Sequence, residues 1–282
     1  FADLLITRDH CLVCYPSLAE KGFAPSYQTL QSFDEEKGPR VIFSDPEQSV
    51  YLADMSGDGL TDIVRIRNGS VCYWPNKGYG RFGAKVAMDH APWFDHEDIF
   101  NQQRIRLADV DGSGTMDIIY IAADGIKYFP NQSGNSFGQE IFINQRLPTH
   151  NLAQIATLDI LGDGTDCIVW SSPMLGDHPP ALKYLRLMGE GKPYLLTEVN
   201  NNMGLVTRMK YAPSTKFYLR DQRNGTPWIT KLPFPVLVVE RVETWDEVNR
   251  NRFVSKYAYH HGYFDGVERE FDTLVYSTGF ET

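Results

Sequence analysis

The stretch "DMSGDGLTD", residues 54–62, recurs as "DVDGSGTMD" at residues 109–117. Both stretches begin with Asp, end with Asp eight residues later, and carry Gly and small polar residues between. The same offset of 55 aligns "YWPNKGYGRFG" (73–83) with "YFPNQSGNSFG" (128–138). Since chance does not hold one offset over so many identities, the chain contains an internal repeat of about 50 residues.

Two further copies of the repeat flank this pair. An offset of 59 aligns three pairs of residues, namely Asp3 with Asp62, Pro16 with Pro75 and Phe23 with Phe82. An earlier copy therefore ends in "CYPSLAEKGF" (14–23), and a later one begins at "IATLDILGDGTDCIVW" (155–170). Because the chain begins without Met and the acidic loop of the earliest copy would precede residue 1, we expect it to continue a longer protein.

Each copy has the pattern of short β-strands. In the second copy we expect strands at 49–54, 62–66 and 71–74, and in the third copy at 105–109, 117–121 and 126–129. Asn-Gly (68–69) and Asp-Gly (124–125) suit the tight turns between them. These segments show no helical period, and four short strands in a unit of about 50 residues are typical of a propeller blade. The sequence predicts an all-β fold.

The two acidic loops have the composition of a calcium site. Counted from the first Asp, oxygen-bearing side chains occupy positions 1, 3, 5 and 9, Gly occupies position 6, and a carbonyl at position 7 could add a ligand. Calcium takes about six to eight oxygen ligands, so such loops suit it. The candidate ligands are Asp54, Ser56, Asp58, Leu60 and Asp62 in the first loop, and Asp109, Asp111, Ser113, Thr115 and Asp117 in the second. The alternative is a tight turn without metal, in which the Asp side chains cap backbone N–H groups.

The fourth copy departs from this pattern. Its loop, "DILGDGTD" (159–166), is one residue shorter and carries Leu161 at position 3. Asp159, Asp163 and Asp166 remain as weaker metal candidates.

Composition excludes several other functions. The chain has 282 residues and a net charge of −9 without a basic stripe, so nucleic acid is not an expected partner. No apolar run approaches the roughly 20 residues of a membrane helix, so we expect no membrane insertion by this segment. No signal peptide is visible. The four cysteines, two of them in "CLVCY" (11–15), are interpreted as buried thiols, with a redox or metal role as the alternative.

The chain contains no motif for catalysis. We find no GxSxG, P-loop or dinucleotide-binding motif and no Ser/His/Asp order, so no catalytic residue is predicted. His260 and His261 are adjacent in a predicted strand, where their side chains would point to opposite faces. A structural role is therefore expected for both.

The repeat fades in the second half of the chain. Pro and Gly in "MLGDHPPA" (174–181) mark a transition, so we place one domain at 1–190 and another at 191–282. Longer strands follow, in two hairpins predicted at 193–213 and 234–264. Between them, 214–235 is expected to form an irregular crossing.

Several stretches resemble known families. The acidic repeats resemble the FG-GAP (VCBS-type) repeats of calcium-binding propellers. Longer stretches, including "RIRLADVDGSGTMDIIYI" (104–121), "YAPSTKFYLRD" (211–221) and "PWITKLPFPVLVVERVETWD" (227–246), resemble the B component of bacterial insecticidal Tc toxins, which shares this region with SpvB-like and Rhs-type proteins. The resemblance covers about residues 1–271. After Phe271 the family usually runs into a Gly-Phe-Gly stretch, whereas here "DTLVYSTGFET" follows.

The resemblance implies a fold and a role. It implies about four propeller blades at 1–190, the first incomplete, and the start of an Rhs-type β-shell at 191–282. The propeller would dock on the pentameric, channel-forming A component, and the shell would join the C component to enclose its toxic part. The expected function is then non-catalytic, in a secreted toxin complex. The alternative is a calcium-dependent adhesion or lectin-type propeller, and a hydrolase that uses clustered Asp residues at a metal is a weaker hypothesis.

Overall fold

The computed structural model describes residues 3–8, 11–18, 21–39, 49–149, 153–172, 182–189, 191–230, 232–265 and 268–281. This part of the chain is nearly all-β and forms several sheets, as the repeats predicted. Two compact units are present, Phe1–Thr157 with Val169–Tyr184, and Leu158–Ile168 with Leu185–Thr282. The domain boundary at residue 190 stays a prediction, and the transition at 174–181 lies outside the described residues.

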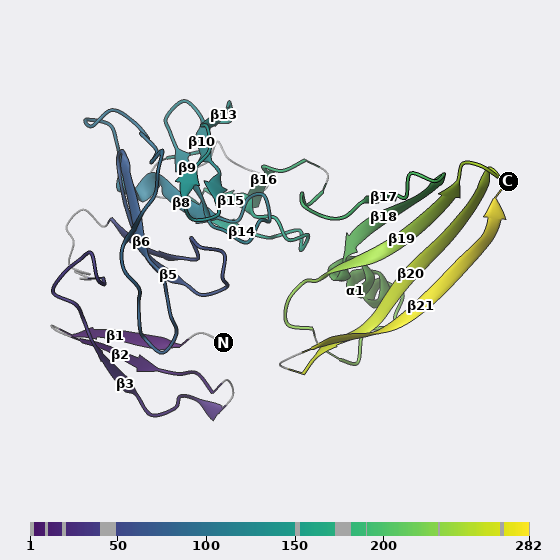
Figure 1. Cartoon of the computed structure of the whole chain (residues 1–282), viewed down its shortest axis with the longest axis horizontal. Helices are drawn as coiled ribbons and strands as arrows, with labels where there is room; N and C mark the ends of the chain where they lie inside the picture. The colour runs from purple at the N-terminus through teal and green to yellow at the C-terminus, as the bar shows by residue number, and fades with distance from the viewer. Residues whose placement is uncertain are drawn as a thin grey trace. The chain divides into compact units, whose positions relative to one another are not determined.

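Short antiparallel sheets follow one another along the first part of the chain (Figure 1). The first contains β1 (Leu4–Arg8), β2 (Cys11–Tyr15) and β3 (Tyr27–Leu30). The second contains β4 (Val50–Ala53), β5 (Asp62–Arg67), β6 (Ser70–Trp74) and β7 (Val86–Ala87). The third contains β8 (Ile105–Ala108), β9 (Asp117–Ile121), β10 (Ile126–Phe129) and β13 (Ile141–Ile143), preceded by a 3-10 turn at Gln102–Arg104, and a small hairpin joins β11 (Asn131–Gln132) to β12 (Ser136–Phe137). A further sheet contains β14 (Gln154–Leu158), β15 (Cys167–Ser171) and β16 (Leu182–Arg186).

The strands of the second and third sheets lie where the repeats predicted them. Both sheets have four antiparallel strands, in the orders β4-β5-β6-β7 and β8-β9-β10-β13. Neighbouring strands follow one another along the chain, with the β11–β12 hairpin inserted between β10 and β13, so each sheet is an antiparallel meander. Each of these two copies of the repeat therefore folds as one four-stranded sheet.

One hydrophobic core joins the second and third sheets. Its fully buried members include Met55, Val64, Ile66, Phe94, Ile118 and Tyr120. Phe94 lies 5.4 Å from Tyr120 and 5.6 Å from Phe129, measured between ring centroids. Each fully buried large apolar side chain contributes about 1.5–3 kcal/mol to folding. The two sheets therefore fold as one packed body.

The two acidic loops also touch each other. The Met116 N–H donates to the Asp54 carbonyl oxygen at 2.9 Å. A Cβ at Gly57 would lie 2.8 Å from the Thr115 Cγ2, and Gly57 has φ +78°. Only glycine combines this φ with this close approach at low cost. Successive sheets are thus joined at their aspartate loops.

A five-stranded antiparallel sheet dominates the second unit (Figure 1). It contains, in order, β17 (Glu198–Asn200), β18 (Leu205–Pro213), β19 (Leu237–Asp246), β20 (Asn251–Phe264) and β21 (Arg269–Glu281). The hairpins β17–β18 and β19–β20 confirm the two that the sequence predicted. β21 continues the sheet through the residues after Phe271.

The expected irregular crossing at 214–235 is wrong for its first ten residues, which form α1 (Ser214–Arg223). The helix begins after Pro213 and ends at Arg223, with Asn224 as its C-cap, followed by Gly225 with φ +78°. The helix packs against β20 and β18 (Figure 1). Its buried Phe217 lies 5.5 Å from Tyr259 between ring centroids, and its buried Asp221 is bonded to His260, both residues of β20. A helix this short gains its stability from packing, so its own sequence indicates it only weakly.

Candidate metal-binding loops

Each acidic loop connects the first two strands of a sheet. The loop at 54–62 joins β4 to β5, and the register pairs Ala53 with Asp62. The loop at 109–117 joins β8 to β9, and Ala108 pairs with Asp117. The closing Asp is therefore the first residue of an inner strand, next to the residue that enters the loop.

The closing aspartates are buried hydrogen-bond acceptors. Asp62 accepts the N–H of Met55 at 3.0 Å and that of Asn76 at 2.8 Å. Asp117 accepts the N–H of Val110 at 3.1 Å and that of Asn131 at 2.7 Å. Both aspartates have no exposed surface. Each carboxylate thus ties the start of its own loop to the end of the third strand.

The earliest copy of the repeat keeps this tie. Asp3 accepts the N–H of Ser17 at 2.8 Å, and the two residues are 14 positions apart, as are Asp62 and Asn76. The carbonyl of Pro16 accepts the N–H of Ala24 at 2.8 Å. The same bond recurs from Gly83 to Pro75 and from Gly138 to Pro130. The alignment of Asp3 with Asp62 is therefore confirmed at atomic level.

The opening aspartates cap the loop backbone. Asp54 accepts the N–H groups of Gly57 and Gly59, each at 2.7 Å. Asp109 accepts the N–H of Gly114 at 3.0 Å. These bonds correspond to the turn interpretation of the loops. They leave calcium as a further prediction, since a capping carboxylate can also bind an ion with its remaining lone pairs.

Three carboxylates converge in the loop at 109–117. Asp109, Asp111 and Asp117 each offer one oxygen, and these oxygens lie within 4.8 Å of one another. Nowhere else in the described part of the chain do three His, Cys, Asp or Glu side chains gather as closely. Burial raises the pKa of Asp117 to about 7, and the Asp111 carboxylate acts in the same direction. A divalent cation among these oxygens would favour the ionised carboxylates.

The other predicted ligands of this loop lie beside the cluster. The hydroxyls of Ser113 and Thr115 are 3.0 Å apart, within hydrogen-bonding distance of each other. Thr115 is buried. The donor set therefore fits calcium in type, because calcium takes hard oxygen ligands.

The loop at 54–62 does not gather its carboxylates in this way. Asp58 accepts the N–H of Leu60 at 2.8 Å, and the Ser56 hydroxyl donates to Asp54 at 3.4 Å. Burial raises the pKa of Asp62. The five predicted ligands are present, but the geometry favours the loop at 109–117 as the metal candidate.

In the fourth loop the three candidate aspartates have different neighbours. Asp159 accepts the N–H groups of Gly162 and Gly164 at 2.7 and 2.8 Å. Asp163 is buried and forms an ion pair with Arg186. Asp166 does not join these two in a cluster of carboxylates among the described residues. Sequence reasoning did not find Arg186, which is 23 residues from Asp163.

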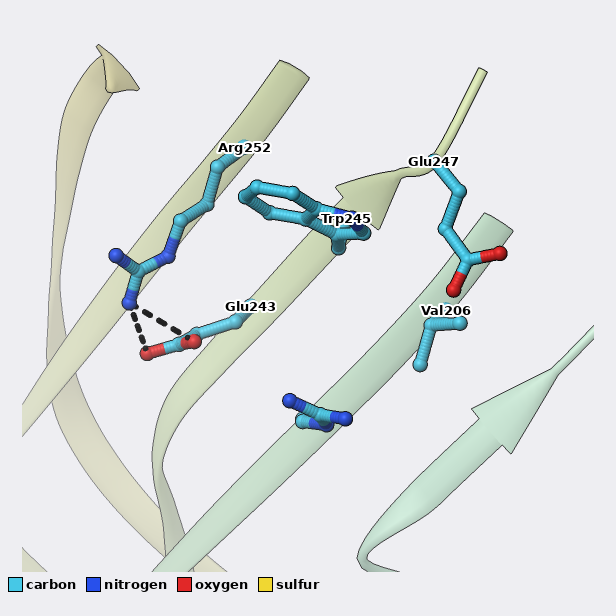
Figure 2. Close-up of a pocket in the computed structure, with 6 residues that line it drawn as sticks. Val206, Glu243, Trp245, Glu247 and Arg252 are labelled. Carbon is cyan, nitrogen blue, oxygen red and sulfur yellow. Dashed lines mark hydrogen bonds and ion pairs between the residues drawn. The ribbon is translucent and has the colours of Figure 1, made fainter. Parts of the chain in front are cut away.

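A hollow with charged walls lies on β18–β20 (Figure 2). It measures about 340 Å³ and is lined by Val206, Arg208, Glu243, Trp245, Glu247 and Arg252. Arg252 donates to both oxygens of Glu243 at 3.1 Å, and Arg208 pairs with Glu198 at 2.8 Å. These pairs cross from strand to strand, which stabilises the sheet. No nucleophilic side chain is among the lining residues.

The two histidines hold structural hydrogen bonds. The Nδ1 of His260 lies 2.6 Å from the Oδ2 of Asp221, which also accepts the indole N–H of Trp228 at 2.8 Å. Burial acts to raise the pKa of Asp221, but the bonds from Trp228 and His260 outweigh it and lower that pKa. His261 accepts the N–H of Ile229 at 3.1 Å. His260 thus fastens α1 to β20, and His261 fastens the segment after α1 to the same strand.

All four cysteines are free thiols. Cys14, Cys72 and Cys167 are buried, and Cys11 is half-buried. This agrees with the interpretation of buried thiols. No helix among the described residues has the length and apolar character needed to span a membrane.

Residues 131–282 match the family described as "Insecticide toxin TcdB middle/N-terminal region". No curated relative matches the chain. Among solved structures, the chain is similar to one in the "Structure of Photorhabdus luminescens Tc holotoxin pore, Mutation TccC3-D651A", with 31% identity and a TM-score of 0.80, over 95% of this chain and 12% of that one.

Two further structures are similar. The "Crystal Structure of TcdB2-TccC3-Cdc42" shares 32% identity at a TM-score of 0.69, over 79% of this chain and 10% of that one. The "Crystal Structure of TcdB2-TccC3 without hypervariable C-terminal region" shares 29% identity at a TM-score of 0.69, over 93% and 12%. The chain thus spans about one tenth of the length of these proteins. On the family match and these likenesses together, the chain belongs to the Tc toxin B-component family, in its TcdB middle/N-terminal region.

Proposed function

We propose that this chain is a non-catalytic structural and docking part of a secreted Tc toxin B component. Its repeated sheets are FG-GAP-like blades of a β-propeller that binds the channel-forming A component. Its second unit begins the shell that the B component forms with the C component. Through the docked propeller, the complex gates the release of the enclosed toxin.

One observation carries this proposal. The chain matches 95% of its length, at 31% identity, to a chain in a Tc holotoxin pore. A structure whose printed name pairs TcdB2 with TccC3 gives the second likeness. The matched chains are about eight times longer than this one. The partners are therefore part of the proposal, and they are taken from those printed names and from the family.

The architecture supports the proposal physically. Successive sheets share one core and touch at their aspartate loops, as in the bonds from Met116 to Asp54 and from Asn131 to Met55. Such contacts make a rigid array of repeated sheets, which suits a surface that must stay in shape while bound to a large partner.

We also propose that calcium has a structural role in the loop at 109–117. Asp109, Asp111 and Asp117 would supply carboxylate oxygens, and Ser113 and Thr115 would supply further oxygens. The ion would offset the cost of burying the Asp117 carboxylate. Its contribution would be to stability, since ligands that fill the coordination shell leave no water to activate.

The experiment is hydrogen exchange on the full-length protein, alone and with each partner. With a pentameric A component, peptides covering 50–149 are expected to lose deuterium uptake. With the C component, peptides covering 198–264 are expected to lose it. Uptake unchanged by both partners, with no measurable complex, would overturn the proposal.

The alternative, an adhesion or lectin-type propeller, gives a different result. Binding of the same protein to a glycan array, abolished by EDTA and restored by calcium, would favour adhesion. Binding to the A component at nanomolar concentration, without glycan binding, would favour docking.

A further inference from the structure

We propose that the Arg186 guanidinium is the built-in cation of the aspartate loop at 159–166, so that this loop needs no metal ion. The proposal goes beyond the docking function and concerns how the fourth copy of the repeat is held in place. It uses residues of the second unit only.

Both oxygens of Asp163 are already engaged. Asp163 has 8% of its surface exposed. One carboxylate oxygen is ion-paired with Arg186 of β16. The other accepts the hydroxyl of Thr165 at 2.7 Å and its N–H at 3.2 Å. A buried carboxylate needs such partners, because leaving it alone is costly.

Asp163 occupies the position at which the other loops carry Asp58 and Ser113, the fifth from the opening Asp. In the loop at 109–117 the three clustered carboxylates belong to positions one, three and nine, and position five is Ser113. In the loop at 159–166 the opening Asp159 is engaged by the N–H groups of Gly162, Asp163 and Gly164, at 2.7, 3.1 and 2.8 Å. Arg186 is the charged partner of Asp163, and the other hydrogen bonds to this carboxylate come from Thr165 within the loop.

A guanidinium suits this role chemically. Arg stays protonated at any pH that a folded protein meets, and its N–H groups match a carboxylate. Unlike a bound ion, it cannot be removed by a chelator. The fourth loop therefore keeps its charge balance when free calcium falls, whereas the loop at 109–117 would lose its cation.

The contacts of the loop at 159–166 indicate why a cation that calcium removal cannot displace would matter there. A Cβ at Gly162 would lie 3.0 Å from the Cβ of Pro235, and one at Gly164 would lie 3.1 Å from the Cδ of Lys192. Both glycines have positive φ. The loop thus packs closely on Pro235, two residues before β19, and on Lys192 in the segment before β17. Fixing it with Arg186 keeps this packing independent of calcium.

The test is hydrogen exchange on the full-length protein with calcium and with EDTA. For the wild type, EDTA is expected to raise exchange at 109–117 and to leave 159–166 unchanged. A rise at 159–166 would overturn the proposal, because the loop would then hold a removable ion. If EDTA changes neither loop, structural calcium fails, while the claim for Arg186 still stands on the variants.

The variants address Arg186 directly. Arg186→Gln is expected to speed exchange of the amides at 162–165 by at least about tenfold, in calcium and in EDTA alike. Arg186→Lys should restore part of the protection. Arg208→Gln is the matched control, since it removes an exposed pair with Glu198 and should leave 159–166 unchanged. Exchange at 159–166 that is the same in Arg186→Gln as in this control would refute the proposal. If Arg186→Gln does not fold, the EDTA response of the wild type decides.

Discussion

Replacing Asp117 by Asn should change protein stability in opposite directions with and without calcium. The structure raises the pKa of this carboxyl from 3.8 to about 7. A raised pKa in the folded state gives stability that is complete below the unfolded pKa and is lost as pH rises through about 7. At pH 8 the wild type without metal therefore carries the full cost of a buried charge. A shift of about three pKa units corresponds to about 4 kcal/mol.

Asn removes this cost but leaves one donor without an acceptor. The amide oxygen of the new Asn side chain can still accept the Asn131 N–H, but its NH2 group then faces the Val110 N–H, and both are donors. The Tyr128 hydroxyl donates to the wild-type carboxylate at 3.1 Å. In the variant it can rotate and accept a hydrogen bond from the new NH2 group. One unsatisfied buried N–H costs about 1–3 kcal/mol. In EDTA at pH 8, Asp117→Asn should thus stabilise the protein by about 1–3 kcal/mol.

Calcium should reverse this order. At about a thousandfold excess over its Kd, an ion adds about 4 kcal/mol to the wild type, whereas the variant has lost a ligand. The assay is urea unfolding followed by tryptophan fluorescence, at pH 8, with EDTA and with calcium. Asp124→Asn is the matched control, because Asp124 is an exposed turn residue of the same sheet. An equal calcium gain in both variants would refute the metal role, and a loss of stability in EDTA would refute the reasoning from burial.

Two more substitutions test the fold. Gly57→Ala places a Cβ 2.8 Å from Thr115 and should lower the free energy of unfolding by about 1–3 kcal/mol. Gly59 has a similar φ but open space around it, so Gly59→Ala should lower the free energy of unfolding by less. Equal losses of stability in the two variants, measured by thermal unfolding, would contradict the contact between the loops. Asp221 has a lowered pKa, so its bond with His260 gives stability that is present above the unfolded pKa of about 3.9 and is lost as pH falls through the folded value. The difference in unfolding free energy between wild type and Asp221→Asn should therefore narrow as pH falls below about 4, and a difference independent of pH would count against this bond.

The repeat predicted more of the fold than any single segment did. The alignment predicted that Asp3 occupies the same structural position in its copy as Asp62 does in the next one. The hydrogen bond from the Ser17 N–H to Asp3 confirms this. This worked because the hydrogen bond is local in each copy, with acceptor and donor 14 positions apart. The ion pair of Asp163 with Arg186 is not part of the repeated pattern, so the alignment could not indicate it.

The helix α1 shows the other limit. Its end has a recognisable signal, since Gly225 follows the last turn and Arg220 and Arg223 lie within it. Phe217 is the one buried apolar side chain of the helix, and a buried Asp such as Asp221 is not expected on the apolar face of a helix. That carboxylate is stable there because Trp228 and His260 donate to it from later in the chain. Contacts with residues later in the chain therefore determine that this segment is helical. The Pro and aromatic residues around it favoured the prediction of an irregular crossing instead.

The Asn131 N–H donates to the Asp117 carboxylate, and this bond, here called the clasp, restricts how such a protein can change length over evolution. Duplicating an entire copy would bring a new clasp along with it, and the Asn131 side chain, which donates to the Met55 carbonyl, would find an equivalent carbonyl in the copy before it. Inserting a residue within β9 or β10 would instead shift their register, separate Asp117 from Asn131 and leave a buried carboxylate without this donor. Growth by whole copies is then the tolerated route, and lengthening should be confined to the connections beyond each clasp.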